Sequence, residues 1–314
     1  MTATNEIPDD TALPALAEIR AAGLARALAG LGVEDCHLEL MLRGYSPGSR
    51  ATIEARTGPR RFAVKAYGED PSTEAELYEA LAAAGVAGSD GARVPPLLAW
   101  NRELRLLVIG WLEGPTAQQL VEEGQGKRAG ELAARWLQRV ATLPVKLGPP
   151  FGAARMLHRA RKWVVTLSAA DPGLGTAAAT LLEMLAGTQP EERNPRLVHS
   201  TFYARHLLDL DGGPGVIDWQ RFGQGPVELD AGMFLASVWR SGLRQNVVAM
   251  EAARAEEAFL AGTATFLNER ALAWHRAAAL LRLADKLIMR QSDDWLARAH
   301  SLLGEAARLA HTAG

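Results

Sequence analysis

The sequence contains one cysteine, Cys36, among 314 residues, which excludes an internal disulfide and a metal site built from several thiolates. We expect Cys36 to be a small buried residue in a reducing compartment. An excess of one charge sign is also lacking, because 34 Lys and Arg face 36 Asp and Glu, without a basic run. This balance gives no electrostatic footprint for nucleic acid or an acidic membrane, so neither partner is expected.

Long hydrophobic runs are absent too. The longest apolar stretches, such as "HLLDLDGGPGVI", are broken by charge and glycine well short of the roughly 20 residues needed to cross a bilayer. The opening "MTATNEIPDD" lacks the basic and then apolar pattern of a signal peptide, so we expect a cytoplasmic protein. The chain is nevertheless 48% hydrophobic, enough to bury a large core and to form two packed lobes.

The first third of the chain changes from helical to strand periodicity. Apolar residues recur at helical spacing from Asp10 to Leu31, which predicts an amphipathic helix ended by Gly30 and Gly32. From Cys36 to Tyr67 apolar and polar residues alternate around two turn clusters, "SPGS" and "TGPR". This pattern predicts three short antiparallel strands.

The segment "TEAELYEALAAAG" predicts a helix with an acidic first turn, stopped by Gly85. A strand pair follows, with a loop around Asn101 to Glu103 and a buried strand from Leu106 to Leu112. From Thr116 on, Ala-, Leu- and Arg-rich stretches at helical spacing dominate. We therefore predict an α+β protein, with a small sheet-containing N-terminal lobe over residues 1–112 and a large, mostly helical C-terminal lobe over 113–314.

A lysine and a carboxylate in the small lobe form the first candidate site. "FAVKAY" places Lys65 at the end of an alternating strand, and Glu74 lies in the first turn of the helix that follows. A strand lysine needs such a helix carboxylate to hold its ammonium against a ligand phosphate. The alternative is a surface lysine with solvated helix charges, for which Glu76 and Glu79 are rival carboxylates.

The second candidate site lies in "VHSTFYARHLLDLDGGPGVIDWQRFGQGPVELDAG". His199 closes one apolar strand, and the third strand of the segment, "GVID", ends in Asp218. A strand-end carboxylate followed by Trp219 and a glycine-bearing loop is suited to hold a divalent cation on a triphosphate. The alternative is a strand-terminal aspartate that caps a turn.

In this order the motifs resemble the aminoglycoside phosphotransferase and choline kinase family, a branch of the protein-kinase-like fold. The family's loop H-G-D-x-x-x-x-N, its I-D-W or I-D-F strand end and its G-D-P-x-x-D-L-A segment correspond to "HSTFYARH", "GVIDW" and "GPVELDAG". The segments "RFAVKAY", "TEAELYEAL", "VPPLL" and "LLVIGWLEG" also follow the family's order. The resemblance covers roughly Leu38 to Trp239.

The resemblance implies a role for each matching position. Lys65 would grip the phosphates of ATP with Glu74 as its partner, Asp218 would bind Mg²⁺, and Asp230 would support the loop as a structural carboxylate. The loop over the nucleotide would run from Tyr45 to Arg50. The residues of this loop that contact the nucleotide would be Tyr45, Ser46, Gly48 and Ser49. A hinge that presents its backbone to the adenine would consist of Gly110, Trp111 and Leu112.

The catalytic loop departs from the family at three positions. Thr201 replaces the catalytic Asp, His206 replaces the metal-binding Asn, and Ser200 replaces a Gly. A threonine hydroxyl cannot take a proton from an alcohol at neutral pH, although a general base contributes only about 10²- to 10⁴-fold to rate. An imidazole is also a poor ligand for Mg²⁺. His199 completes the catalytic-loop positions, with a structural hydrogen-bonding role, and does not replace the base.

Three functions remain open from the sequence. The first is ATP-dependent phosphorylation of a hydroxyl on a small molecule, weak or lost because of Thr201. The second is an inactive pseudokinase that binds a nucleotide or small ligand or acts as a scaffold for an unknown protein partner. The third is a helical interaction protein without a ligand. Candidate acceptor-side residues, which otherwise are solvated charges and core aromatics, are Glu228, Glu251, Glu256, Glu257, Trp239, Trp274 and Trp295.

Overall fold

The computed structural model describes residues 7–24, 38–192, 194–289 and 292–313, and the chain divides into two compact units, Met1–Glu113 and Gly114–Gly314. Cys36 and the helix end predicted at Gly30 and Gly32 lie outside the described residues. Each unit has its own hydrophobic cluster, so each is described by itself.

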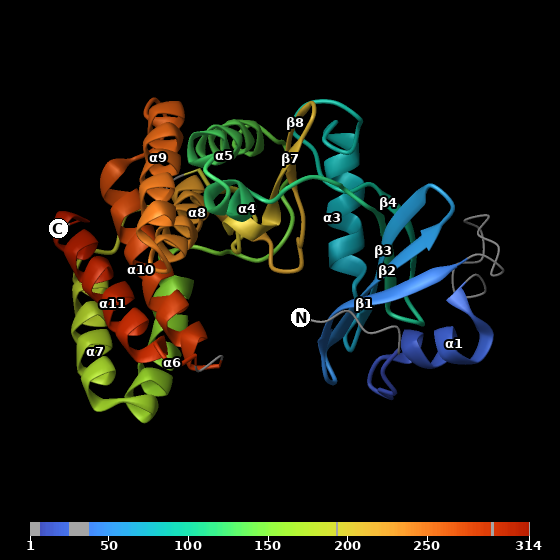
Figure 1. Cartoon of the computed structure of the whole chain (residues 1–314), viewed down its shortest axis with the longest axis horizontal. Coiled ribbons are helices and arrows are strands. Elements are labelled where there is room, and N and C mark those ends of the chain that lie inside the picture. Colours follow the sequence, from blue (N-terminus) through green and yellow to red (C-terminus); the bar gives the residue numbers. More distant parts are fainter. Residues whose placement is uncertain (1–6, 25–37, 193, 290–291, 314) are drawn as a thin grey trace. The chain divides into compact units, whose positions relative to one another are not determined.

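The first unit is built on a five-stranded antiparallel sheet in the order β1-β2-β3-β5-β4 (Figure 1). Its strands are β1 (Glu39–Ser46), β2 (Arg50–Thr57), β3 (Arg60–Tyr67), β4 (Leu97–Asn101) and β5 (Leu106–Gly110). Both predicted hairpin turns form, and each contains a glycine with positive φ, Gly48 at 68° and Gly58 at 54°. The predicted last strand is two residues too long, because β5 ends at Gly110.

Helix α1 (Pro14–Ala22) packs on one face of this sheet. Leu16 and Ile19 of α1 share a buried cluster with Ile53 and Val64. The predicted helix is interrupted at Gly23, where the chain leaves helical geometry with a φ of 79°. Neighbouring side chains of a strand point to opposite faces, so the residues beside Val64 face away from α1.

Helix α3 (Ser72–Ala83) ends close to where the sequence predicts. Gly85, the predicted stop, has a φ of 77°, a conformation that glycine adopts without a steric penalty. Glu74 lies in the first turn of α3, and its side chain reaches Lys65 of β3. The sheet face that does not contact α1 therefore carries this lysine.

A second ionic group lies in the same sheet. Glu54 of β2 is fully buried and accepts hydrogen bonds from Arg43, Arg56 and Arg61 at 2.6, 2.5 and 2.8 Å. Burial favours the neutral carboxyl, but the three guanidinium groups prevail and lower the pKa of Glu54. Glu54 is thus an ionised carboxylate whose cost of burial is offset by paired cations.

The second unit is mostly helical, as predicted. Its helices are α4 (Ala117–Glu122), α5 (Gly126–Val140), α6 (Ala153–Ala170), α7 (Pro172–Gly187), α8 (Val227–Gly242), α9 (Asn246–Thr263), α10 (Glu269–Ile288) and α11 (Trp295–Ala313). Buried side chains of α6, α7, α8, α10 and α11 form one continuous core. Of the helices in the described ranges, none combines the length and the apolar character that a membrane crossing requires.

Two short β-ladders frame the predicted catalytic loop. One pairs β6 (Arg196–Val198) with β9 (Gly223–Gly225), and the other pairs β7 (Leu207–Leu210) with β8 (Gly213–Val216). A one-turn helix, η2 (Ala204–His206), lies within the loop. The predicted strand through Asp218 is wrong in its end point, because β8 stops at Val216 and Asp218 adopts a φ of 69°.

Candidate functional site

Lys65 and Glu74 form a buried ion pair in the first unit. The Lys65 Nζ lies 2.5 Å from Glu74 Oε1, and the Tyr67 hydroxyl donates to Glu74 Oε2 at 2.7 Å. Lys65 is 4% exposed and Glu74 6%, whereas the rival carboxylates Glu76 and Glu79 are exposed. The carboxylate thus fixes the position of the ammonium. That this ammonium holds a nucleotide phosphate stays a prediction.

The loop predicted from Tyr45 to Arg50 is shorter in the structure. Tyr45 and Ser46 belong to β1 and Arg50 begins β2, so only the three residues between them form the turn. Asp10 binds this hairpin, because its carboxylate accepts from the Gly48 N–H at 2.8 Å and from the Tyr45 hydroxyl at 2.9 Å. Those two bonds lower the pKa of Asp10.

Further backbone bonds hold the turn and the predicted hinge. The Ser49 N–H donates to Ser46 O at 3.0 Å, which closes the turn. In the hinge, the Gly110 N–H donates to Pro96 O at 2.8 Å. The guanidinium of Arg61 lies 4.6 Å from the centre of the Trp111 ring. Leu112 is partly buried. Contact of these residues with a nucleotide is a prediction that the geometry leaves open.

In the second unit, one buried carboxylate organises the predicted catalytic loop. Asp230, in the first turn of α8, accepts from the backbone N–H of His199 at 2.6 Å and of Ser200 at 2.8 Å. Burial raises the pKa of Asp230 to about 7, against the effect of these two donors. From α10, Arg282 donates to the Ser200 carbonyl at 3.0 Å. The loop backbone is therefore held from two helices.

Ser200 explains why a glycine is the family's residue at this position. Its φ of 57° lies in the left-handed region, which costs a non-glycine residue roughly 1–2 kcal/mol. Its hydroxyl donates to the carbonyl of Arg221, and this bond offsets part of that cost. The serine thus ties the loop to the segment that follows Asp218.

Thr201 stands where the family's catalytic aspartate would be, and its hydroxyl is hydrogen-bonded. His199 Nε2 lies 2.9 Å from the carbonyl oxygen of Ile217, which can only accept, so Nε2 carries the proton. Nδ1 of the neutral ring is then an acceptor, and the Thr201 hydroxyl donates to it at 3.0 Å. Thr201 is 8% exposed and supplies no carboxylate.

His206 and Asp218 place two electron-pair donors side by side. His206 Nδ1 lies 2.8 Å from the Thr201 carbonyl, so Nδ1 carries the proton and Nε2 faces Asp218 Oδ2 at 3.5 Å. Burial lowers the pKa of His206 to about 3, although the Asp218 carboxylate opposes this shift. The imidazole is therefore neutral at physiological pH. The Asp218 side chain remains 37% exposed.

These donors fit a divalent cation that takes its other ligands from phosphates and water. Asp218 alone suits Mg²⁺, which prefers oxygen, whereas the pair with His206 also suits Mn²⁺ or Zn²⁺. Across the described ranges, no group of three or more His, Cys, Asp or Glu side chains is arranged to hold a metal ion. A cation bound here would neutralise phosphate charge.

Most of the predicted acceptor-side residues have structural partners. Glu228 accepts from Asn268 N, Glu251 from Gly126 N, and Glu256 pairs with Arg276 at 2.5 Å. Trp274 is fully buried, and Trp295 packs against the helical core. Trp239, Glu256 and Glu257 line one pocket of about 790 Å³ beside α8 and α9. Packing and helix capping therefore account for four of the seven candidates, and the other three share this pocket.

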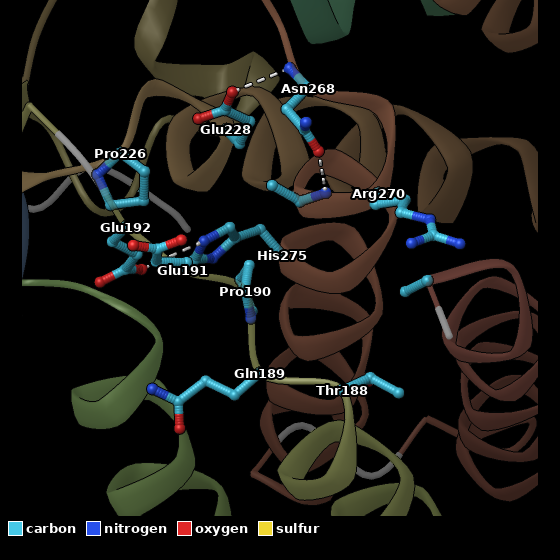
Figure 2. Close-up of a pocket in the computed structure, with 12 residues that line it drawn as sticks. Thr188, Gln189, Pro190, Glu191, Glu192, Pro226, Glu228, Asn268, Arg270 and His275 are labelled. Atoms are coloured by element: carbon cyan, nitrogen blue, oxygen red, sulfur yellow. Dashed lines mark hydrogen bonds and ion pairs between the residues drawn. The ribbon is translucent and has the colours of Figure 1, made fainter.

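A pocket of about 540 Å³ opens among α7, α8 and α10 (Figure 2). His275 and Glu192 face each other there, with Nε2 of the ring 3.5 Å from Glu192 Oε1. His275 is 1% exposed, and neither ring nitrogen has a hydrogen-bond partner. This pair could not be found from the sequence, because its members lie far apart in the chain and belong to no motif.

Arginines beside the loop were missed as well. Arg282 of α10 and Arg205 of the loop both lie over the Tyr203 ring, at 5.6 and 4.6 Å from its centre. On α6, Arg155 and Arg159 lie one turn apart in the stretch "RMLHRARKW". Their i, i+4 spacing was a visible signal, but nothing in the sequence places α6 next to the loop.

Several solved structures superpose on this chain. The choline kinase LicA of Streptococcus pneumoniae superposes with a TM-score of 0.62 at 14% identity, over 91% of this chain and 98% of that one. A putative aminoglycoside phosphotransferase of Ralstonia eutropha JMP134 gives 0.60 at 15% identity, over 92% and 96%. The streptomycin–ATP ternary complex of APH(2″)-IIa gives 0.54 at 15% identity, over 90% and 95%.

These likenesses confirm the predicted α+β, kinase-like fold. No curated protein matches the sequence. The sequence does match the phosphotransferase enzyme family over residues 42–280, which is more than half of the chain and includes both Lys65 and the catalytic loop. The expectation drawn from the ordered motifs is thereby confirmed, and the chain belongs to the phosphotransferase enzyme family.

Proposed function

We propose that the protein transfers the γ-phosphate of ATP to a small molecule. The observation that carries this proposal is the buried Lys65–Glu74 ion pair, in which an ammonium is held at a fixed position by a carboxylate. Membership of the phosphotransferase family supports it, as does the ATP present in one structural relative. Lys65 binds phosphate oxygens in this proposal, and Asp218 binds a divalent cation.

The protein's own residues supply position and charge in this reaction. Lys65 orients the phosphates, and Asp230 and Arg282 keep the loop backbone rigid through its amides and a carbonyl. The loop offers no carboxylate to take the proton of an alcohol, because Thr201 stands at that position and its hydroxyl donates to His199. Transfer to an alcohol is therefore slower than with a carboxylate base, by about 10²- to 10⁴-fold.

A pseudokinase is the second candidate, and the substitutions at Thr201 and His206 favour it. Both side chains are neutral at physiological pH. The loop therefore lacks the carboxylate base at position 201 and the oxygen ligand for a metal at position 206. In this case the protein binds a nucleotide without turnover. The two candidates share nucleotide binding and differ in the formation of ADP.

Thermal unfolding with and without ATP tests the shared part. Binding to the folded state raises its stability by about 2.7 kcal/mol at a ligand concentration 100 times Kd. We expect a shift with ATP and Mg²⁺ or Mn²⁺ that Lys65→Ala abolishes and that Lys162→Ala, at an exposed position on α6, leaves unchanged. No shift of the wild type at millimolar ATP contradicts both candidates and leaves a helical interaction protein.

A further inference from the structure

Three guanidinium groups beside the catalytic loop lack a carboxylate partner. Arg155, Arg159 and Arg282 form no ion pair with any carboxylate in the described part of the chain. Other arginines, such as Arg43, Arg61 and Arg128, are paired with carboxylates. The positive charge of the three is therefore not offset by a direct ion pair.

Arg282 joins this group to the loop. It is 4% exposed, donates through Nη1 to the Ser200 carbonyl, and keeps a buried Nε without a hydrogen-bond partner. Asp285, three residues further along α10, interacts electrostatically with Arg282 but forms its ion pair with Lys286, at 3.5 Å, and burial raises the pKa of Asp285. The charge of Arg282 is thus not neutralised by a dedicated carboxylate.

Arg155 and Arg159 extend the group along α6. Their guanidinium groups lie 4.5 and 5.9 Å from the centre of the Phe151 ring, and Arg159 lies 5.7 Å from that of Trp163. Burial and the charges of Arg282, Arg221 and Arg155 together lower the pKa of Arg159 to about 10. The cations are thus close enough to repel one another, which an anion among them would offset.

The guanidinium fork recognises one kind of ligand particularly well. Its parallel N–H donors match the oxygens of a phosphate or a carboxylate, and such charge-assisted bonds are about twice as strong as neutral ones. A cationic acceptor would be repelled at the same place. The charge of this group therefore selects an anionic molecule next to Thr201.

An anionic acceptor also accounts for the missing base. An alcohol must lose a proton when its oxygen forms a bond to phosphorus, whereas an ionised phosphate or carboxylate oxygen carries no proton at neutral pH. We propose that the acceptor is a small oxyanion held by Arg155, Arg159 and Arg282, and that its ionised oxygen attacks the γ-phosphorus of ATP. This inference rests on the proposed phosphoryl transfer and names its substrate class.

The step balances without proton transfer. A bond forms between the acceptor oxygen and the γ-phosphorus, the bond to the β,γ-bridging oxygen breaks, and ADP leaves with that electron pair. A phosphate monoester dianion and ATP⁴⁻ give a diphosphate ester trianion and ADP³⁻, and a carboxylate gives an acyl phosphate and ADP³⁻. Thr201 therefore needs to accept no proton.

Binding of small anions in the absence of ATP tests the site independently of the nucleotide. By calorimetry at low ionic strength, we expect methyl phosphate or acetate to bind saturably and choline not to bind. Arg155→Gln and Arg159→Gln should each lower the affinity for the anion at least tenfold. Arg161→Gln, at an exposed position on the same helix, should leave the affinity unchanged. Equal affinity in all three variants, or no saturable anion binding at millimolar concentration, overturns the proposal.

Turnover tests the attacking atom. With ATP and Mn²⁺ at a pH above the second pKa of a phosphate ester, which is about 6, we expect ADP to form with methyl phosphate or acetate and no proton to be released. Acetyl phosphate is identified by trapping with hydroxylamine, and a methyl diphosphate by phosphorus NMR. ADP formed only with an alcohol such as propanol, with one proton released, indicates a Thr201–His199 relay and overturns the step.

Failure of the two proposals can be told apart. Anion binding without an ATP-induced thermal shift refutes the proposed function and keeps the arginine site. A thermal shift with ATP but no product from either anion refutes the proposal that an ionised acceptor oxygen attacks the γ-phosphorus.

Discussion

The two candidate sites differ in how they have kept the family's residues. In the first unit the Lys65–Glu74 pair is complete and buried, and both partners are the residues that the family uses. In the second unit the loop backbone is held as firmly, by Asp230 and Arg282, but the side chains at Thr201 and His206 are different. The buried ion pair of the first unit has thus been retained, whereas the positions of the base and of the metal-binding asparagine have changed.

The largest expected effect comes from breaking the retained pair. Glu74→Gln leaves the ammonium of Lys65 buried without its counter-charge, and removal of one partner of a buried pair costs about 3–5 kcal/mol. Urea unfolding monitored by tryptophan fluorescence measures this loss. Glu76→Gln, at an exposed position of the same helix, should change the free energy of unfolding by less than about 0.5 kcal/mol. Equal effects would show that the pair does not stabilise the fold.

Restoring the loop carboxylate should sharpen the comparison in the opposite direction. Thr201→Asp provides a proton acceptor, so transfer from ATP to an alcohol should rise by at least about 100-fold. The same change brings a negative charge to the anion site and should weaken the binding of methyl phosphate. Asp218→Ala in the same background serves as the inactive control. An unchanged rate with alcohols would mean that the residue at this position does not limit catalysis.

His206 makes the second site sensitive to acid. Its pKa in the folded protein is about 3 against an ordinary 6.5, so the unfolded chain binds the proton more readily. Between these values the folded state loses stability as pH falls, by about 1.4 kcal/mol per pH unit. His206→Asn should remove this dependence, so that the free energy of unfolding of the variant rises relative to that of the wild type as the pH falls from 6 to 4. The same pH dependence of the free energy of unfolding in the variant and the wild type would contradict the lowered pKa of His206.

The smallest effect is expected at Ser200, where two changes can be compared. Ser200→Gly relieves the left-handed backbone but loses the hydroxyl bond to Arg221, so its net effect should be within about 1 kcal/mol. Ser200→Ala loses the bond and keeps the strain, and should be the less stable variant by about 1 kcal/mol. Thermal unfolding of both variants checks the order, and a more stable alanine variant would contradict it.

Local patterns predicted much of the fold. Alternation and turn glycines located β1, β2 and β3, and helical spacing with Gly85 located α3. The failures arose where a pattern continued beyond its element. The helical pattern from Asp10 runs across Gly23, where α1 ends, and "GVID" reads as a strand although Asp218 adopts a left-handed backbone conformation.

The candidate site was predictable only where its parts are near in sequence or match a motif. Glu74 follows Lys65 by nine residues, so strand and helix periodicity bring them within reach. Arg282 lies 82 residues from the Ser200 carbonyl that it binds. Arg155 lies near the start of α6, so most of α6 and all of α7 separate it from the loop in sequence. Such contacts depend on how α6 and α10 pack, and no local pattern determines that packing.

The way the loop is anchored has a consequence for its evolution. Its anchors are backbone amides and carbonyls bound by Asp230, Arg282 and His206, and the side chain of Thr201 contributes only one hydrogen bond, to His199. The residue at this position can therefore change without refolding the loop. A scaffold of this kind lets a lineage exchange one acceptor chemistry for another by few substitutions, and leaves the reverse path open.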